Sequence, residues 1–279
     1  MSVHGSVHTP TNPIERRLTM LDLQRRTNAG HKWTVITSYD ALTAHLFENA
    51  GVPAILVGDS AAMVVLGYDS TLPITSDQMM PLVQGVVRGT KRAVVIADLP
   101  FGSYQQSPAQ ALETAAAFMK DGGAQAVKLE GGAAVLPQVE LLANSGVPVV
   151  GHLGLTPQSV NLLGGYRVQG RGESGEMVLR DAKNLEAAGA AAVVLEAIPS
   201  ELAARVSEVL SIPTIGIGAG PATDAQVIVW QDLLGLTPDP APRFVRRYAH
   251  LRETIGDAVT AWVEDVESGA YPAPEHEYS

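Results

Sequence analysis

The sequence predicts a single (β/α)₈ barrel, and three features of the chain support this fold class. Eight short apolar or β-branched segments recur along it, helical patterns lie between them, and no linker-like stretch divides it. Such nearly continuous apolar runs are typical of strands buried on both faces of a parallel sheet. The length of 279 residues fits one barrel of this kind. An open, doubly wound sheet is the alternative with the same alternation.

The eight expected strands are each bounded by Gly, Pro or a polar residue. They cover residues 33–37, 54–57, 93–97, 126–129, 147–150, 191–195, 214–217 and 227–233. The eighth is the least regular, because the sequence over 227–234 also allows a helix.

The expected helices lie between these strands. Ser107 precedes Pro108, and Gln110 stands where a capping box needs it, so a helix is expected to run to Lys120. Further helices are expected over 75–89, 174–188 and 200–210, the last with Ser200 as its cap. From 243 to 267, apolar residues recur at helical spacing, which predicts one or two closing helices or an oligomer contact.

The two ends of the chain differ from its middle. Residues 1–13 and 273–279 are polar, contain proline and show no periodicity. We therefore expect a flexible N-terminal arm and a flexible C-terminal tail. Residues 14–272 are expected to form one catalytic barrel domain.

The composition excludes several classes of function. The chain has 19 Lys and Arg against 29 Asp and Glu, a net charge of −10, and no basic run. This argues against binding to nucleic acid or an anionic membrane surface. The absence of cysteine excludes disulfides and thiolate chemistry and fits a reducing cytoplasm. No segment is long and apolar enough to predict a membrane span, and the N-terminus does not resemble a signal peptide.

Polar side chains end almost every expected strand. In strand order they are Ser38, Tyr39 and Asp40, then Asp59 and Ser60, Asp98, Lys128 and Glu130, His152, and Glu196. In a (β/α)₈ barrel these strand ends meet at one mouth, which is where the active sites of such enzymes lie. The placement therefore predicts an enzyme with its site at this mouth.

Three of these residues are carboxylates, which repel one another unless a cation or a proton intervenes. Asp59, Asp98 and Glu130 provide an all-oxygen donor set of the kind that suits Mg²⁺. Lys128 adds a positive charge for an anionic substrate. Each residue also has a structural interpretation: Asp59 could cap a helix, Asp98 could make a turn, and Lys128 and Glu130 could form an ordinary ion pair.

Side chains of a strand alternate between its two faces. This rule predicts that Lys128 and Glu130 share one face. It also places Asp59 on the same face as Val57.

The fifth and sixth strands carry a further acid and a histidine. Glu196 ends an apolar run, and loss of hydration there would make its carboxylate a better general base. His152 could donate a hydrogen bond to a substrate oxyanion. The structural alternatives are a Glu196 that caps the following turn and a His152 bonded to a core carbonyl.

Two glycine-rich segments leave their roles open. The segment 216–220, GIGAG, could cradle a phosphate or form a tight turn, and it lacks the spacing of a dinucleotide fingerprint. The segment 164–172 carries two arginines between glycines and could be a lid or a flexible loop.

The sequence of the chain resembles that of a known protein family. From residue 19 to 272 the chain is similar to ketopantoate hydroxymethyltransferases, with the segments in the same order. The most specific segments are LVGDS (56–60), VKLEGG (127–132) and GHLGLTPQS (151–159). The others are TSYD, GYDSTLPIT, ADLPF, GGYRVQGR, VLEAIP, GIGAG and ESGAYP.

The resemblance implies a barrel of the phosphoenolpyruvate/pyruvate-binding type that requires Mg²⁺. It implies transfer of a hydroxymethyl group from 5,10-methylenetetrahydrofolate to 3-methyl-2-oxobutanoate in pantothenate synthesis. By this resemblance Asp59, Asp98 and Glu130 match the metal site, and Glu196 matches the proton acceptor.

The resemblance also concerns the substrates and the assembly. It implies that Asp59, Ser60, Asp98 and Lys128 contact the oxo acid and that His152 lies near it. It assigns no residue to the folate. Family members assemble as a homodecamer, a pentamer of dimers, so self-association is expected here.

Two other hypotheses remain at this stage. One is a Mg²⁺-dependent oxo-acid lyase or mutase of the related pyruvate-type barrels, which commonly carry a catalytic Cys that this chain lacks. The other is a non-catalytic oligomeric barrel, which predicts no dependence on a metal.

Overall fold

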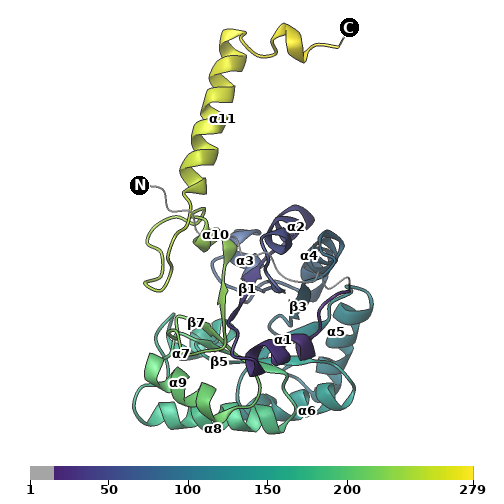
Figure 1. The fold of residues 1–279 in the computed structure, drawn as a ribbon, viewed down its shortest axis with the longest axis vertical. Helices are drawn as coiled ribbons and strands as arrows, with labels where there is room; N and C mark the ends of the chain where they lie inside the picture. The colour runs from purple at the N-terminus through teal and green to yellow at the C-terminus, as the bar shows by residue number, and fades with distance from the viewer. Residues whose placement is uncertain (1–15, 279) are drawn as a thin grey trace.

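The computed structural model describes residues 16–278 and shows a closed barrel of eight parallel strands (Figure 1). The strands pair in sequence order, and β8 pairs with β1 to close the barrel. This confirms the barrel and excludes the open sheet. The expected arm over 1–13 lies outside the described residues. The strands are β1 (Trp33–Thr37), β2 (Ala54–Val57), β3 (Val94–Asp98), β4 (Ala126–Glu130), β5 (Val149–Gly154), β6 (Ala192–Glu196), β7 (Thr214–Ile217) and β8 (Ala225–Ile228).

Helices surround this barrel on most of its circumference (Figure 1). The longer ones are α1 (Met20–Asn28), α2 (Ala41–Asn49), α4 (Ser76–Gly89), α5 (Pro108–Lys120), α6 (Leu136–Asn144), α8 (Glu173–Ala187), α9 (Ser200–Val209) and α11 (Leu251–Ser268). Single-turn elements are α3 (Ala61–Val64), α7 (Val160–Leu163), α10 (Trp230–Leu233), η1 (Ala133–Val135), η2 (Pro157–Ser159) and η3 (Pro274–His276). The last lies in the expected tail.

The buried apolar residues form two clusters, one inside the barrel and one between strands and helices. Ile96, Val150 and Val194 belong to the inner cluster, to which α1 contributes Met20 and Leu23. The outer cluster is larger and packs helix faces against the outward side chains of the strands. The inner cluster gives the polar site above it a rigid apolar floor.

The structure corrects four details of the predicted elements. The fifth strand, predicted over 147–150, runs from Val149 to Gly154 and so contains His152. The eighth strand ends at Ile228, and the rest of its predicted range turns into α10 (Trp230–Leu233). Ser107 does cap α5, but the Gln110 side chain accepts from the Gln106 N–H and so does not complete a capping box. Helix α9 begins at Ser200 itself, after Pro199, without a side-chain cap.

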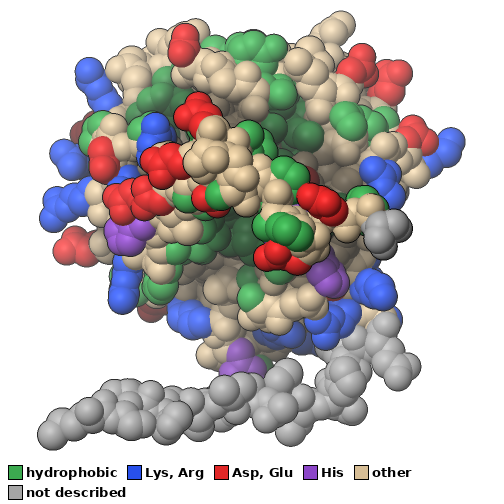
Figure 2. Space-filling view, turned by 90° about the horizontal axis from the view of Figure 1, so that it is seen from above, with side chains coloured by type: hydrophobic (Ala, Val, Ile, Leu, Met, Phe, Trp, Pro, Cys, Tyr) green, Lys and Arg blue, Asp and Glu red, His purple; other side chains and the backbone are tan. Residues whose placement is uncertain are grey.

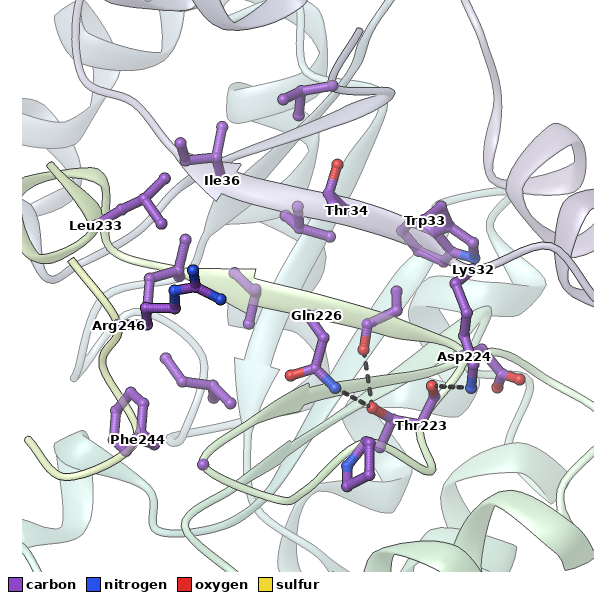
Figure 3. Close-up of a pocket in the computed structure, with 18 of the residues that line it drawn as sticks. Lys32, Trp33, Thr34, Ile36, Thr223, Asp224, Gln226, Leu233, Phe244 and Arg246 are labelled. Carbon is purple, nitrogen blue, oxygen red and sulfur yellow. Dashed lines mark hydrogen bonds between the residues drawn. The ribbon is translucent and has the colours of Figure 1, made fainter. Parts of the chain in front are cut away.

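Helix α11 extends away from the barrel and does not close it (Figure 1). None of its residues is buried, although Ile255, Val259, Trp262 and Val266 form an apolar stripe. A groove of about 830 Å³ lies over β1 and β8, where the polypeptide leaves the strands uncovered. Figure 3 shows Ile36, Leu233 and Phe244 on this groove.

None of the helices described over residues 16–278 is long and apolar enough to cross a membrane. On the face shown in Figure 2, the described Lys and Arg side chains are scattered around the periphery and do not form a band.

Candidate active site at the barrel mouth

The fourth strand directs two charged side chains into the barrel. Lys128 and Glu130 follow Ala126 on its inner face, whereas Val127 and Leu129 pack in the outer cluster. The alternation prediction is therefore confirmed for this strand. The pairing register of the strands places these residues beside other polar residues. Lys128 pairs with Asp98 of β3, and Glu130 pairs with His152 of β5.

Asp59 reaches the mouth by a different route from the one predicted. Val57 packs in the outer cluster, so strict alternation would place Asp59 outside the barrel as well. The strand ends at Val57, and the chain turns at Gly58. Asp59 is then 4% exposed, and its backbone N–H donates to Oδ2 of Asp98 at 3.2 Å. The face prediction was wrong because alternation stops where the strand stops.

Lys128 lies at the centre of the charged cluster. Its Nζ is 2.8 Å from Oδ1 of Asp98, 3.7 Å from Oε1 of Glu130 and 3.2 Å from Nδ1 of His152. Burial alone would lower the pKa of Lys128, but the charges of Asp98, Glu130 and Asp59 outweigh burial and raise it. The lysine is therefore a permanent cation among the acids.

His152 connects this cluster to Glu196. Its Nδ1 is 3.3 Å from Oε1 of Glu130, and its Nε2 is 3.2 Å from Oε2 of Glu196. Burial and the charge of Lys128 lower the pKa of His152, but hydrogen bonding to Glu130 and Glu196 outweighs them and raises it to about 9. Glu130 and Glu196 therefore favour the protonated form of His152, and its contacts in the cluster are with side chains.

Glu196 is the most accessible acid of the cluster. Its side chain is 18% exposed, against 2% for Asp98 and Glu130. The backbone around it is held by hydrogen bonds, from Leu155 N–H to the Glu196 carbonyl and from Ala197 N–H to the Ile217 carbonyl, each 2.9 Å. A fixed carboxylate that faces the open mouth can take a proton from a bound ligand.

The acids near Lys128 are not equivalent. Burial raises the pKa of Asp59, and repulsion from Asp98 and Glu130 raises it further. The pKa of Asp98 is also raised, chiefly by burial, despite its contact with Lys128. Burial acts in the same direction on Glu130, but His152 and Lys128 outweigh it and lower its pKa. Of the three acids, Asp59 and Asp98 are thus the ones whose ionised forms the surrounding protein disfavours.

The donor set fits a hard divalent cation best at Asp59 and Asp98. Oδ1 of Asp98 is buried and lies 2.8 Å from Nζ of Lys128, so a cation bound here would share this carboxylate with the lysine. Mg²⁺ commonly binds through one or two carboxylates plus water and substrate oxygens. Within residues 16–278, no three His, Asp or Glu side chains stand ready as a complete ligand set. Glu130 points its Oε2 at the Gln158 N–H, 2.9 Å away, so its predicted role as a third ligand stays a prediction.

Gln158 is a site residue that the sequence reasoning did not select. It is 5% exposed, and its Nε2 donates to Oδ2 of Asp59 at 2.9 Å while its backbone N–H donates to Glu130. Its Oε1 accepts from the Tyr104 hydroxyl at 2.7 Å. The signal was its place in the specific segment GHLGLTPQS, six residues after His152.

The end of the first strand serves a different purpose from the others. Ser60 Oγ is 2.9 Å from the Tyr39 hydroxyl, so the predicted substrate contact Ser60 lies beside the tyrosine that follows the first strand. Asp40 instead accepts from the N–H groups of Leu42 and Thr43 and caps α2. Only part of the predicted polar rim therefore belongs to the site.

The GIGAG segment forms a tight turn against its neighbours. A side chain on Gly218 would meet the Phe244 ring at 2.8 Å, and one on Gly220 would meet Ser200 at 2.5 Å. Both glycines also have positive φ angles. Close packing and backbone conformation explain these glycines without a phosphate.

Comparison with known proteins gives a consistent result. The family model described as ketopantoate hydroxymethyltransferase matches residues 17–274. A 3-methyl-2-oxobutanoate hydroxymethyltransferase of Thermobifida fusca (strain YX) is 57% identical over 280 residues, covering 98% of this chain and all of the relative. A protein of the same name from Mycobacterium sp. (strain KMS) is 49% identical and covers 99% of both chains.

Solved structures agree on the fold. A phosphonopyruvate hydrolase in complex with oxalate and Mg²⁺ matches with a TM-score of 0.62 and 14% identity, over 94% of this chain and 92% of that chain. A 2,3-dimethylmalate lyase of the PEP mutase/isocitrate lyase superfamily matches with a TM-score of 0.58 and 15% identity, over 93% and 91%. At this identity the likeness shows the barrel architecture alone.

Proposed function

The chain belongs to the ketopantoate hydroxymethyltransferase family and is an enzyme of that class, and from this premise we propose its substrates and mechanism. It transfers a hydroxymethyl group from 5,10-methylenetetrahydrofolate to 3-methyl-2-oxobutanoate, giving 2-dehydropantoate for pantothenate synthesis. The single observation that carries the mechanism is the convergence of Asp59, Asp98, Lys128 and Glu196 at one mouth.

In this proposal Asp59 and Asp98 hold Mg²⁺, with Glu130 completing its surroundings. The bound metal supplies Lewis-acid polarisation of the keto group of the oxo acid. Ser60 and the Lys128 ammonium bind and orient the oxo acid. The local positive charge at the site attracts its carboxylate, although the protein has a net charge of −10.

Glu196 takes the proton from C3 of the oxo acid, and His152 stands 3.2 Å behind it. The imidazole of His152, with Nε2 beside the carboxylate, positions Glu196 and can donate a hydrogen bond to negative charge at the mouth. As C3 forms a bond to the methylene carbon of the donor, the bond from that carbon to one of its two folate nitrogens breaks, and this nitrogen takes up a proton. The carbon stays attached to the second nitrogen until water replaces it. Water then supplies the product hydroxyl, and tetrahydrofolate leaves.

The experiment is C3–H exchange in D₂O, followed by NMR with 3-methyl-2-oxobutanoate and Mg²⁺ but no folate. We expect metal-dependent exchange, and Glu196→Gln should slow it about a hundredfold or more, the usual contribution of a general base. Mg²⁺ affinity should stay unchanged in this variant. Glu208→Gln, an exposed acid on α9, is the matched control.

Two outcomes would contradict this assignment. Wild-type protein that shows no exchange would remove the enolisation step. A Glu196→Gln variant that exchanges normally, or that binds Mg²⁺ more weakly, would show that Glu196 is not the base. The lyase or mutase hypothesis has support from the fold alone, so we do not propose it.

We also propose that α11 mediates self-association. Its apolar stripe is exposed, and the groove over β1 and β8 lacks a covering helix of its own chain. A second copy could place its α11 in this groove and bury both surfaces at once. Val259→Asp should then lower the molar mass measured by light scattering, and Glu253→Gln, at the start of the same helix, should not.

An unchanged mass in Val259→Asp would contradict this contact. The homodecamer and the cytoplasmic location expected from the sequence stay predictions.

A further inference from the structure

The connection after β5 crosses the barrel mouth. The Tyr166 hydroxyl donates to the sulfur of Met63 at 3.6 Å. Met63 lies in α3, three residues after Ser60. The contact therefore joins the segment after β5 to the segment after β2, on the other side of the opening.

The loop tip that carries Tyr166 is held by a hydrogen bond and close packing of the residues that follow it. The Gln169 N–H donates to the carbonyl of Ala197 at 2.9 Å, directly after Glu196. A side chain on Gly170 would meet Leu202 at 2.6 Å, so the chain packs closely there. Gly164 and Gly165 on the other side have positive φ angles and allow the sharp turn into the tip.

Tyr166 lies within the electrostatic influence of the acids of the site. Partial burial raises the pKa of its phenol, and the charges of Asp59, Glu196 and Glu130 raise it further. Even so, Tyr166 remains 53% exposed and Met63 37% exposed. The mouth thus offers an aromatic ring and a polarisable thioether next to the carboxylates, open to a ligand from solvent.

Two guanidinium groups accompany this surface. Arg167 and Arg171 are exposed, and neither forms an ion pair with any residue between 16 and 278. Both arginines lie in the segment that bridges the mouth.

We propose that Tyr166 and Met63 form the docking surface for the flat pterin ring of the one-carbon donor, and that Arg167 and Arg171 bind the carboxylates of its glutamate tail. This inference rests on the proposed function. The donor must place its methylene carbon beside C3 of an oxo acid held among the buried acids, and the inner apolar cluster lies below that site. A planar ring with an anionic tail matches the combination of ring, thioether and two cations on this one segment.

The first experiment measures the KM for 5,10-methylenetetrahydrofolate in Tyr166→Ala and Tyr166→Phe. Loss of the ring should raise the donor KM about tenfold, whereas Phe should keep it within about twofold. The KM for 3-methyl-2-oxobutanoate should stay within about twofold in both. Met177→Ala, an exposed apolar side chain on α8, is a control for surface truncation.

The second experiment compares monoglutamyl and triglutamyl forms of the donor. Wild-type protein should favour the triglutamyl form by about threefold or more, as exposed ion pairs allow. The double variant Arg167→Gln, Arg171→Gln should lose this preference. Arg180→Gln on α8 should retain it.

Failure of this inference is distinct from failure of the proposed function. An unchanged donor KM in Tyr166→Ala would overturn the docking surface, and so would a raised KM for the oxo acid with an unchanged donor KM. C3–H exchange in D₂O would in either case still support the proposed enzyme activity. A tail preference that survives in the double arginine variant would overturn the role of the two cations.

Discussion

Buried carboxylates occur in two regions of this molecule, and their surroundings differ. Glu48, at the end of α2, is 5% exposed and accepts from the backbone N–H groups of Lys91, Arg92 and Ala93 at 3.0, 2.6 and 2.7 Å. Burial would raise the pKa of Glu48, but these three hydrogen bonds outweigh it and lower the pKa. At the barrel mouth, burial and mutual repulsion instead raise the pKa of Asp59.

The difference separates a structural acid, Glu48, from the acids of the proposed metal site. Glu48 has donors that the fold itself provides, so its charge stabilises the native state. Asp59 and Asp98 lie near one lysine, burial disfavours their ionised forms, and in the proposed mechanism a Mg²⁺ ion would offset their charge. Active sites commonly retain such destabilising groups because function requires them.

The largest expected effect comes from removing the lysine that the mouth acids share. Lys128→Met should lower the free energy of unfolding by about 3–5 kcal/mol in EDTA, because it leaves buried charges without a partner. Urea unfolding measures this. Mg²⁺ should restore part of the loss, and Lys120→Met on the exposed side of α5 should have little effect. A loss below about 1 kcal/mol would show that the acids are already relieved by other means.

Glu48→Gln tests the structural acid. We expect a loss of roughly 2 kcal/mol at neutral pH, because charge-assisted hydrogen bonds to three N–H groups are weakened. The sign of the pH dependence follows from the lowered pKa. The contribution of Glu48 is present above the unfolded-state pKa of about 4.3 and is lost as the pH falls through the lower folded-state value.

Wild-type and Glu48→Gln proteins should therefore converge in stability as the pH falls below about 4. C3–H exchange should remain normal in the variant at neutral pH. A stability difference that does not depend on pH would mean that packing, and not charge, makes Glu48 important.

Asp59→Asn should have the smallest effect on stability and the opposite sign. Its folded-state pKa is raised, so ionised Asp59 costs stability as the pH rises above about 3.9. The amide keeps an oxygen for the Gln158 donor, and we expect a gain of about 1 kcal/mol at neutral pH in EDTA. Calorimetric titration should show weaker Mg²⁺ binding. An Asp59→Asn variant that is destabilised and still binds Mg²⁺ normally would contradict both the expected gain in stability and the expected loss of Mg²⁺ affinity.

Sequence reasoning succeeded where a local rule applied along a regular strand. Period-two alternation held for Lys128 and Glu130, because β4 stays extended up to its last residue. It failed for Asp59, because the chain leaves the strand at Gly58. Neither Gln158 nor Tyr104 could be chosen by such a rule, since each acts through contacts with residues 26 to 99 positions away.

The amino-acid order alone determined the alternation of strands and helices, and with it the gathering of acids, lysine and histidine at one end of a parallel barrel. It did so because hydrophobic periodicity and strand direction are local properties. The tertiary structure decided which acids share a cation, which one is held by backbone N–H groups, and that α11 leaves the barrel. Those outcomes depend on distances between side chains remote in the chain, which only closure of the barrel sets.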